Sequence, residues 1–101
     1  MISSAPRIRE ALAQDVTVSG ELLTVDLVDG RTVSVPISWY PRLVHAAPEE
    51  RANWRLIGRG EGIHWPDLDE DVSVEALLAG LGSAESQASF GRWLASRRNS
   101  D

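Results

Sequence analysis

Apolar and polar residues alternate along the first third of the chain, and this period of two predicts β-strands. Turn signals at Gly20 and at Asp29-Gly30 divide the pattern into three segments, so we expect a three-stranded antiparallel meander over about 15–37. The first fourteen residues are not assigned: 7–14 could form a helical turn or lead into a strand, and 1–5 are expected to be disordered. The apolar positions of the meander are Val16, Val18, Leu23, Val25, Leu27, Val33, Val35 and Ile37.

The connection between the second and third strands decides which residues face each other. A two-residue turn at Asp29-Gly30 would place Val25 opposite a serine and leave apolar side chains on both faces. A three-residue loop starting at Val28 instead pairs Val25 with Val33 and keeps one apolar face. We therefore predict this longer loop, a type I turn with Gly30 left-handed in a G1 bulge.

Beyond the meander, proline marks the starts of short helices. Pro41 suits the first turn of one helix, and Pro48, followed by two glutamates, starts another that we expect to end near Asn53. One or two short strands are predicted over about 54–65. Glycines at alternate positions within this range indicate a bulge, a bend or a close backbone approach.

The C-terminal third shows the signals of helices. Ser73 is predicted to be the N-cap of a helix over about 74–80, closed by Gly80 or Gly82. A second, amphipathic helix over about 84–97 (to 98 at most) carries Phe90, Trp93 and Leu94 at i, i+3 and i+4. These elements together predict an α+β fold in one domain, residues 1–101.

Composition excludes several classes of protein. The chain has 101 residues, 43% of them hydrophobic, with a net charge of −5 and neither cysteine nor lysine. These absences exclude disulfides, thiolate nucleophiles, cysteine zinc sites, Schiff-base chemistry and a P-loop lysine. The negative charge disfavours direct binding of nucleic acid. No apolar run is long enough for a membrane span or a signal peptide, so we expect a cytoplasmic protein.

The stretch GIHWPDLDEDVSV, residues 62–74, concentrates the side chains that could carry chemistry. Asp67, Asp69 and Asp71 match the first three ligand positions of an EF-hand loop, but its sixth position is a valine and its twelfth a leucine. We therefore assign no metal or cofactor. The stretch is interpreted as a strand end, a Trp-Pro turn and an acidic helix start, with its carboxylates near the positive end of the following helix.

The blocks WYPRL, NWRLIG and IHWPDLDEDVSV strongly resemble an uncharacterised family of small bacterial proteins catalogued only as a domain of unknown function. The resemblance covers about 16–82. It implies a compact α+β domain with an antiparallel sheet, found alone or, in some relatives, ahead of a helix-turn-helix module. No reaction is attached to the family, so the resemblance implies no catalytic residues.

Our main functional hypothesis comes from the aromatic residues of the central segment. We expect a non-enzymatic protein-interaction or regulatory module, antitoxin-like, whose partner is another protein or a second copy of the chain. Core packing is the competing interpretation of the tryptophans. The candidate interaction surface comprises Trp39, Tyr40, Arg42, Trp54, Arg55, His64 and Trp65.

Two alternative functions stay open at this point. The first is a DNA-linked transcriptional regulator that uses the C-terminal helix pair, with the arginines at 92, 97 and 98 on its second helix. The second is a small metal- or ligand-binding protein centred on His64 and the Asp67–Asp71 segment, which requires these side chains to converge.

Overall fold

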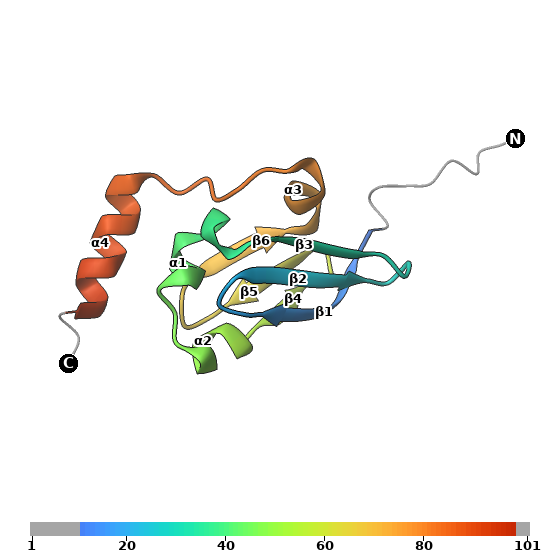
Figure 1. The fold of residues 1–101 in the computed structure, drawn as a ribbon, viewed down its shortest axis with the longest axis horizontal. Coiled ribbons are helices and arrows are strands. Elements are labelled where there is room, and N and C mark those ends of the chain that lie inside the picture. The colour runs from blue at the N-terminus through green and yellow to red at the C-terminus, as the bar shows by residue number, and fades with distance from the viewer. Residues whose placement is uncertain (1–10, 99–101) are drawn as a thin grey trace, which may run out of the picture.

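The computed structural model describes residues 11–98, so the expectation for 1–5 lies outside the described residues. Two three-stranded antiparallel sheets form two layers, and short helices lie around their edges and ends (Figure 1). This arrangement confirms the predicted α+β fold. Among the described residues, no helix has both the length and the apolar character that crossing a membrane requires.

The first sheet is the predicted meander, in the order β1-β2-β3. Its central strand places Leu23, Val25 and Leu27 in the core, and Val25 lies opposite Val33 as expected from the longer loop. The Gly30 N–H donates to the Leu27 carbonyl at 3.0 Å, and Gly30 has a φ of 98°. The three-residue loop is therefore confirmed. The strands are β1 (Ala13–Val18), β2 (Leu22–Leu27) and β3 (Thr32–Pro36).

Short helices connect the first sheet to the second. Both predicted helix starts are confirmed, because Pro41 and Pro48 occupy first-turn positions, and the second helix ends at its C-cap Asn53. Proline is tolerated there because the amide it lacks has no partner within a helix. The elements are the 3₁₀ helix η2 (Ile37–Trp39), α1 (Pro41–Val44) and α2 (Pro48–Ala52).

The second sheet has the order β4-β5-β6, and its third strand corrects our interpretation of the acidic stretch. We expected the carboxylates between 67 and 71 to form an acidic start to the helix capped by Ser73, but residues 70–73 form a strand that pairs with β5. Glu70 and Val72 point into the molecule, whereas Asp71 and Ser73 are exposed. Residues 70–73 do alternate between inward and outward positions. Because the first inward position is a glutamate, the sequence does not show the alternation of apolar and polar residues that indicates a strand. The strands are β4 (Arg55–Ile57), β5 (Gly62–Trp65) and β6 (Glu70–Ser73).

The helix α3 (Val74–Ala79) has both predicted ends. The Ser73 hydroxyl accepts a hydrogen bond from the Ala76 N–H at 2.9 Å, which is the geometry of an N-cap. Gly80 ends the helix with a φ of 78°, a left-handed conformation that glycine adopts without steric cost.

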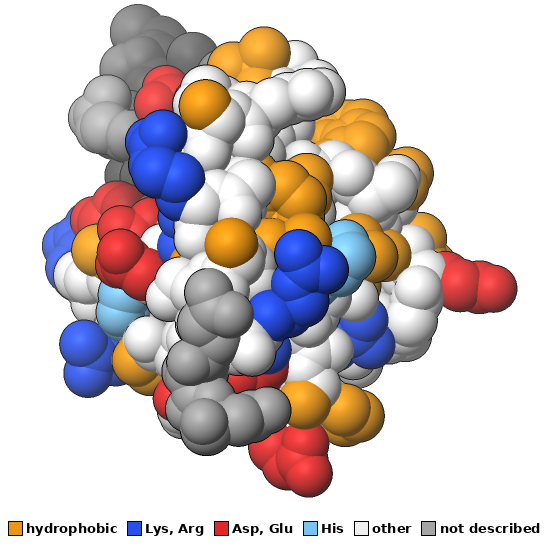
Figure 2. Space-filling model, turned by 90° about the vertical axis from the view of Figure 1, so that its left-hand side faces the viewer, with side chains coloured by type: hydrophobic (Ala, Val, Ile, Leu, Met, Phe, Trp, Pro, Cys, Tyr) orange, Lys and Arg blue, Asp and Glu red, His pale blue; other side chains and the backbone are white. Residues whose placement is uncertain are grey.

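The last helix is α4 (Gln87–Arg98), which starts three residues later than the predicted residue 84. Residues 81–86 connect α3 to α4 without regular structure. None of the residues of α4 is buried, and Figure 2 shows the side of the molecule on which this helix lies. Its attachment is largely polar and aromatic: Arg97 donates to Glu50 at 2.8 Å, and the guanidinium of Arg42 lies 5.0 Å from the Trp93 ring centroid. The two C-terminal helices lie apart, not packed as a helix-turn-helix (Figure 1).

Candidate functional site

Two of the seven residues of the candidate interaction surface belong to the core. Trp65 is fully buried, and its indole N–H donates to the Arg51 carbonyl at 3.0 Å. Tyr40 is 3% exposed, and its hydroxyl donates to the Leu81 carbonyl at 3.2 Å. Both side chains are satisfied inside the fold, so the expectation that they contribute to a binding surface is corrected.

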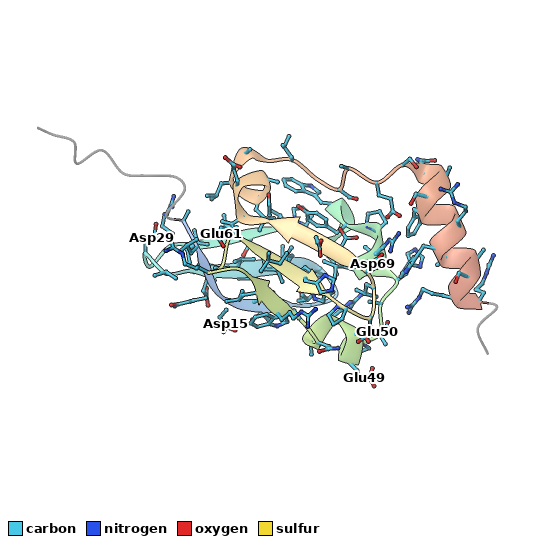
Figure 3. The ribbon with its side chains drawn as sticks, turned by 180° about the vertical axis from the view of Figure 1, so that it is seen from behind. Asp15, Asp29, Glu49, Glu50, Glu61 and Asp69 are labelled. Atoms are coloured by element: carbon cyan, nitrogen blue, oxygen red, sulfur yellow. The ribbon has the colours of Figure 1, made fainter. Side chains whose placement is uncertain are left out.

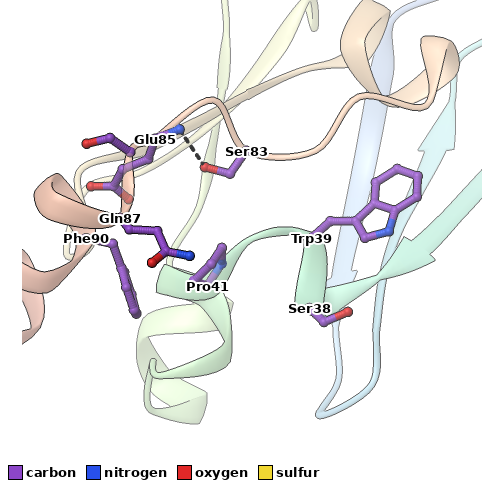
Figure 4. A pocket seen from close by; sticks show the side chains of 8 residues that line it. Ser38, Trp39, Pro41, Ser83, Glu85, Gln87 and Phe90 are labelled. Atoms are coloured by element: carbon purple, nitrogen blue, oxygen red, sulfur yellow. Dashed lines mark hydrogen bonds between the residues drawn. The ribbon is translucent and has the colours of Figure 1, made fainter.

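Trp39 and Trp54 are half-buried and are not brought together into one aromatic face. Trp39 belongs to η2, next to the first sheet, whereas Trp54 immediately precedes β4 of the second. Trp39 helps to line a cavity of about 460 Å³ between η2, α1 and the start of α4 (Figure 4). The remaining lining residues are Ser38, Pro41, Ser83, Glu85, Ser86, Gln87 and Phe90.

Arg55 and His64 come together in a row across the second sheet. Arg55 pairs with His64, which pairs with Asp71, and the His64 Nδ1 is hydrogen-bonded to the Asp71 carboxylate. This face of the sheet has no helix over it when the molecule is seen from behind (Figure 3). The hypothesis of a His64–carboxylate contact is thus met by Asp71, whereas Asp67 instead accepts a hydrogen bond from Asn53.

Metal ligation does not follow from this contact. Within residues 11–98, no three histidine, cysteine, aspartate or glutamate side chains are grouped so that they could hold a metal ion. The two side chains are joined to each other by a single hydrogen bond, from His64 Nδ1 to the Asp71 carboxylate. The pair is best described as a cross-strand contact on an open sheet face.

The clearest concave feature near these residues is a groove beside β6. It consists of two cavities of about 310 and 290 Å³ that share Glu70, Asp71, Ser83 and Ala84 as lining residues. One wall is β6, and the opposite wall is the segment 82–85 that leads towards α4. We call this feature the β6 groove, lined by Tyr40, Arg42, residues 69–73, Ala76 and residues 82–85.

The segment 82–85 is held in place by contacts to η2 and α1. The Ser83 N–H donates to the Trp39 carbonyl at 3.0 Å, and Glu85 forms an ion pair with Arg42. A Cβ on Gly82 would lie 3.4 Å from the Trp39 carbonyl oxygen, which is ordinary van der Waals contact, so the segment packs against Trp39 here. These contacts fix the segment beside β6 without pairing the two backbones.

The outer edge of β6 faces the groove, and backbone N–H and C=O groups on this edge have no partner strand. β6 is an edge strand, and the Val74 N–H donates to the Glu61 carbonyl at 2.9 Å just beyond its end. In an antiparallel ladder the bonding pairs alternate, so Val72 bonds to β5 and the N–H and C=O of Asp71 and Ser73 point outward. A free edge of this kind is able to pair with another chain.

Arg42 closes one end of the groove and is itself fully engaged. Its guanidinium donates to Glu85 through Nε at 2.9 Å and to the Leu68 carbonyl through Nη1 at 2.7 Å. The hydrogen bond from Arg42 holds the pKa of the Glu85 carboxyl below its usual range. Arg42 therefore lies in the site that the sequence suggested, but as a structural clamp between α1, the turn before β6 and the segment 82–85.

Glu70 is the side chain of the groove whose environment is most unusual. It is 8% exposed, lines both cavities and makes no hydrogen bond within the described residues. Burial raises its pKa to about 7, although the nearby Arg42 acts in the opposite direction. Sequence reasoning missed Glu70. The alternation of residues 70–73, with the apolar Val72 inward, is the signal that could have placed Glu70 on the inner side as well.

The chain matches a family model over residues 13–83, which is most of its length. The family is described as "Protein of unknown function (DUF2442)". The chain belongs to this family. The DUF2442 match agrees with the resemblance over about 16–82 and includes β6, whereas Glu85 and α4 lie beyond its end.

Two solved structures resemble this DUF2442 chain. A crystal structure of a protein of unknown function from Rhodospirillum rubrum is 30% identical, with a TM-score of 0.64, covering 78% of this chain and 95% of the other. A solution NMR structure of an uncharacterised protein from Chromobacterium violaceum is 22% identical, with a TM-score of 0.61, covering 89% and 79% respectively. The second likeness concerns the fold alone. No curated protein matches the chain significantly.

Proposed function

We propose that this DUF2442 chain is a non-enzymatic protein-interaction module that binds an extended segment of a partner protein along β6. The observation that carries the proposal is the free edge of β6, which opens onto a groove instead of being covered by another element. Addition of a strand to such an edge gives affinity through backbone hydrogen bonds and selectivity through alternate side chains.

The surroundings of β6 support this choice of edge. Natural proteins usually protect an edge strand by shortening, charging or covering it. β6 is short and carries two carboxylates, but its edge is not covered: the segment 82–85 is held across the groove by Ser83 at Trp39 and by Glu85 at Arg42. The side of the groove beneath Val72 is apolar, because Tyr40 and Ala76 also line it. An entering strand therefore has both a hydrogen-bonding edge and an apolar surface.

We further propose that this binding serves a regulatory, antitoxin-like role in the cytoplasm. Holding a segment of another small protein in an extended form prevents that segment from taking any other conformation. A module with one such groove and no need for chemistry of its own can regulate a partner in this way.

The proposal is tested by blocking the edge without unfolding the sheet. Asp71→Pro removes an outward N–H that β5 does not use, and proline is tolerated on an edge strand in this orientation. Asp71→Thr is the matched control, because it makes the same loss of charge and of the His64 contact but keeps the N–H. Both variants should retain the fold, checked by circular dichroism and thermal unfolding.

The readout is binding of peptides selected from a displayed library on the unaltered protein. We expect the selected peptides to bind Asp71→Thr with an affinity similar to that of the unaltered protein and Asp71→Pro at least tenfold more weakly. Hydrogen exchange of the Asp71 and Ser73 amides should slow on binding. Peptides that bind both variants equally, with no protection of these amides, would show that β6 is not the binding edge.

A further inference from the structure

Within the described residues, no group donates a hydrogen bond to the Glu70 carboxylate, although Glu70 exposes only 8% of its surface. No fully buried side-chain oxygen or nitrogen in this part of the chain lacks a partner, so the Glu70 oxygens keep contact with solvent in the cavities that Glu70 lines. Burial still disfavours the ionised form of such a carboxylate. A ligand that brings a cationic donor to Glu70 therefore offsets part of this effect in addition to making a new contact.

The charges around Glu70 indicate what kind of donor fits. The guanidinium of Arg42 donates its hydrogen bonds to Glu85 and to the Leu68 carbonyl, so Glu70 feels its charge but receives no hydrogen bond from it. Asp69 also lines the groove, and Asp71, whose side chain points to the open face, acts on Glu70 through its charge. With one cation against four carboxylates, the groove keeps a net negative charge that is complementary to a cationic ligand.

The alternation of β6 predicts where a cation would be placed on a bound strand. Residues opposite Glu70 and Val72 point to the same, inner side, and a residue opposite Asp71 points to the open face. The ligand position facing Val72 contacts apolar surface, and the position two residues away faces Glu70. Metal ions are a less fitting cation here, because no three ligating side chains converge in the described residues.

We propose that the segment bound along β6 carries an arginine or lysine whose charged group contacts Glu70, two positions from an apolar residue that packs against Val72. This inference rests on the proposed function, since it identifies the partner segment of the same groove. The proposed recognition pattern is therefore a basic residue two positions before or after an apolar residue.

The probe for this inference is a synthetic peptide of sequence acetyl-Thr-Val-Thr-Arg-Thr-Val-Thr-amide. Its pattern reads the same in both directions, so it presents arginine and valine correctly whether it pairs parallel or antiparallel to β6. The control peptide replaces arginine with citrulline, which has nearly the same shape and no charge. Dissociation constants are measured by NMR titration at pH 8 with the unaltered protein, with Glu70→Gln and with Asp71→Pro.

We expect the arginine peptide to bind the unaltered protein about tenfold more tightly than the citrulline peptide and to shift the Asp71 and Ser73 amides. In Glu70→Gln this difference should shrink to less than about twofold. Equal binding of the two peptides, with these amides still shifted, would overturn the basic recognition pattern and leave strand addition standing. Failure of both peptides to shift either amide would overturn both proposals, and their binding to Asp71→Pro would do the same.

The pH dependence gives a second readout. The charged and titratable groups around Glu70 are Arg42 and Tyr40 near α1, Asp69 and Asp71 beside it on the chain, and Glu85 across the groove. With a pKa of about 7, roughly a tenth of Glu70 is ionised at pH 6 and most of it at pH 8. If only the ionised form binds the cation, affinity for the arginine peptide rises about tenfold over this range. In Glu70→Gln the affinity should stay nearly constant, and a tenfold rise retained there would overturn the assignment.

Discussion

Replacing Glu70 with glutamine should stabilise the protein at alkaline pH and have little effect near pH 5. Glutamine keeps the size of the side chain and resembles the protonated carboxyl group, which is the form that the buried site prefers. The variant thus tests, without any ligand, whether the ionised carboxylate is unfavourable in the folded protein.

The sign and the magnitude follow from the two pKa values of Glu70. In the folded protein the pKa is about 7, compared with the ordinary value of 4.5 for an unfolded chain, so folding favours the protonated form. Each pKa unit corresponds to about 1.4 kcal/mol. Glu70 therefore lowers the free energy of unfolding by about 3 kcal/mol above pH 8. This penalty decreases as the pH falls through 7, and it is below about 1 kcal/mol at pH 5.

Urea unfolding of the two proteins at pH 5 and pH 8.5 measures this effect. The gain of Glu70→Gln should be about 3 kcal/mol at pH 8.5 and under about 1 kcal/mol at pH 5, with equal urea dependence of the free energy. Glu21→Gln, at an exposed turn position, is the matched control and should change stability little at either pH. A gain that is equal at the two pH values, or a loss at pH 8.5, would refute the burial argument.

Three further predictions concern the contacts that hold the fold together. Gly60→Ala should destabilise the fold by more than about 2 kcal/mol in thermal unfolding, since Gly60 has a φ of 113° and its Cβ would lie 2.4 Å from a β1 carbonyl oxygen. Ser73→Ala should cost about 1 kcal/mol through loss of the α3 N-cap, measured by urea unfolding. Glu50→Gln should accelerate hydrogen exchange in α4, because the Arg97–Glu50 ion pair helps to hold that helix.

The meander was predictable because local rules decided it. The register between β2 and β3 followed from requiring one apolar face, and Gly30 supplied the positive φ that the loop needs. The helix starts at Pro41 and Pro48 followed from the lack of an amide hydrogen in proline. Each of these predictions depends on residues within a few positions of each other, so tertiary contacts had little opportunity to change the outcome.

The β6 strand was missed because its sequence was interpreted by charge and not by period. Four carboxylates between 67 and 71 indicated a solvated helix start, yet Glu70 faces inward and Asp71 outward. The turn before the strand also depends on Asp69, a non-glycine residue with a φ of 51°. No local rule predicts that a glutamate is buried there. The cavities that Glu70 lines are also lined by the distant segment 82–85, which no local rule places there.

The candidate surface included buried residues because the aromatic residues were grouped by their closeness in the sequence. That grouping does not show whether a side chain faces the core or the solvent. Trp65 lies on the inner face of its strand, and its indole N–H donates to the Arg51 carbonyl. The polar N–H of a tryptophan therefore does not indicate that the side chain is exposed. Arg55 and His64 were brought together only by the β4–β5 register. Sequence spacing of nine residues contains no information about such a cross-strand pair until the intervening loop length is known.

Arg42 explains why the groove is both acidic and stable in shape. One guanidinium joins three parts of the fold: α1, which carries it, the Leu68 carbonyl before β6, and Glu85 beyond the last residue of the family match. If Arg42 instead paired with Glu70, the buried carboxylate would be satisfied internally and the groove would lose its preference for a cation. Because Glu85 engages Arg42, Glu70 stays available at the floor of the groove. The ion pair that fixes the outer wall is thus also what leaves the inner carboxylate free for a ligand.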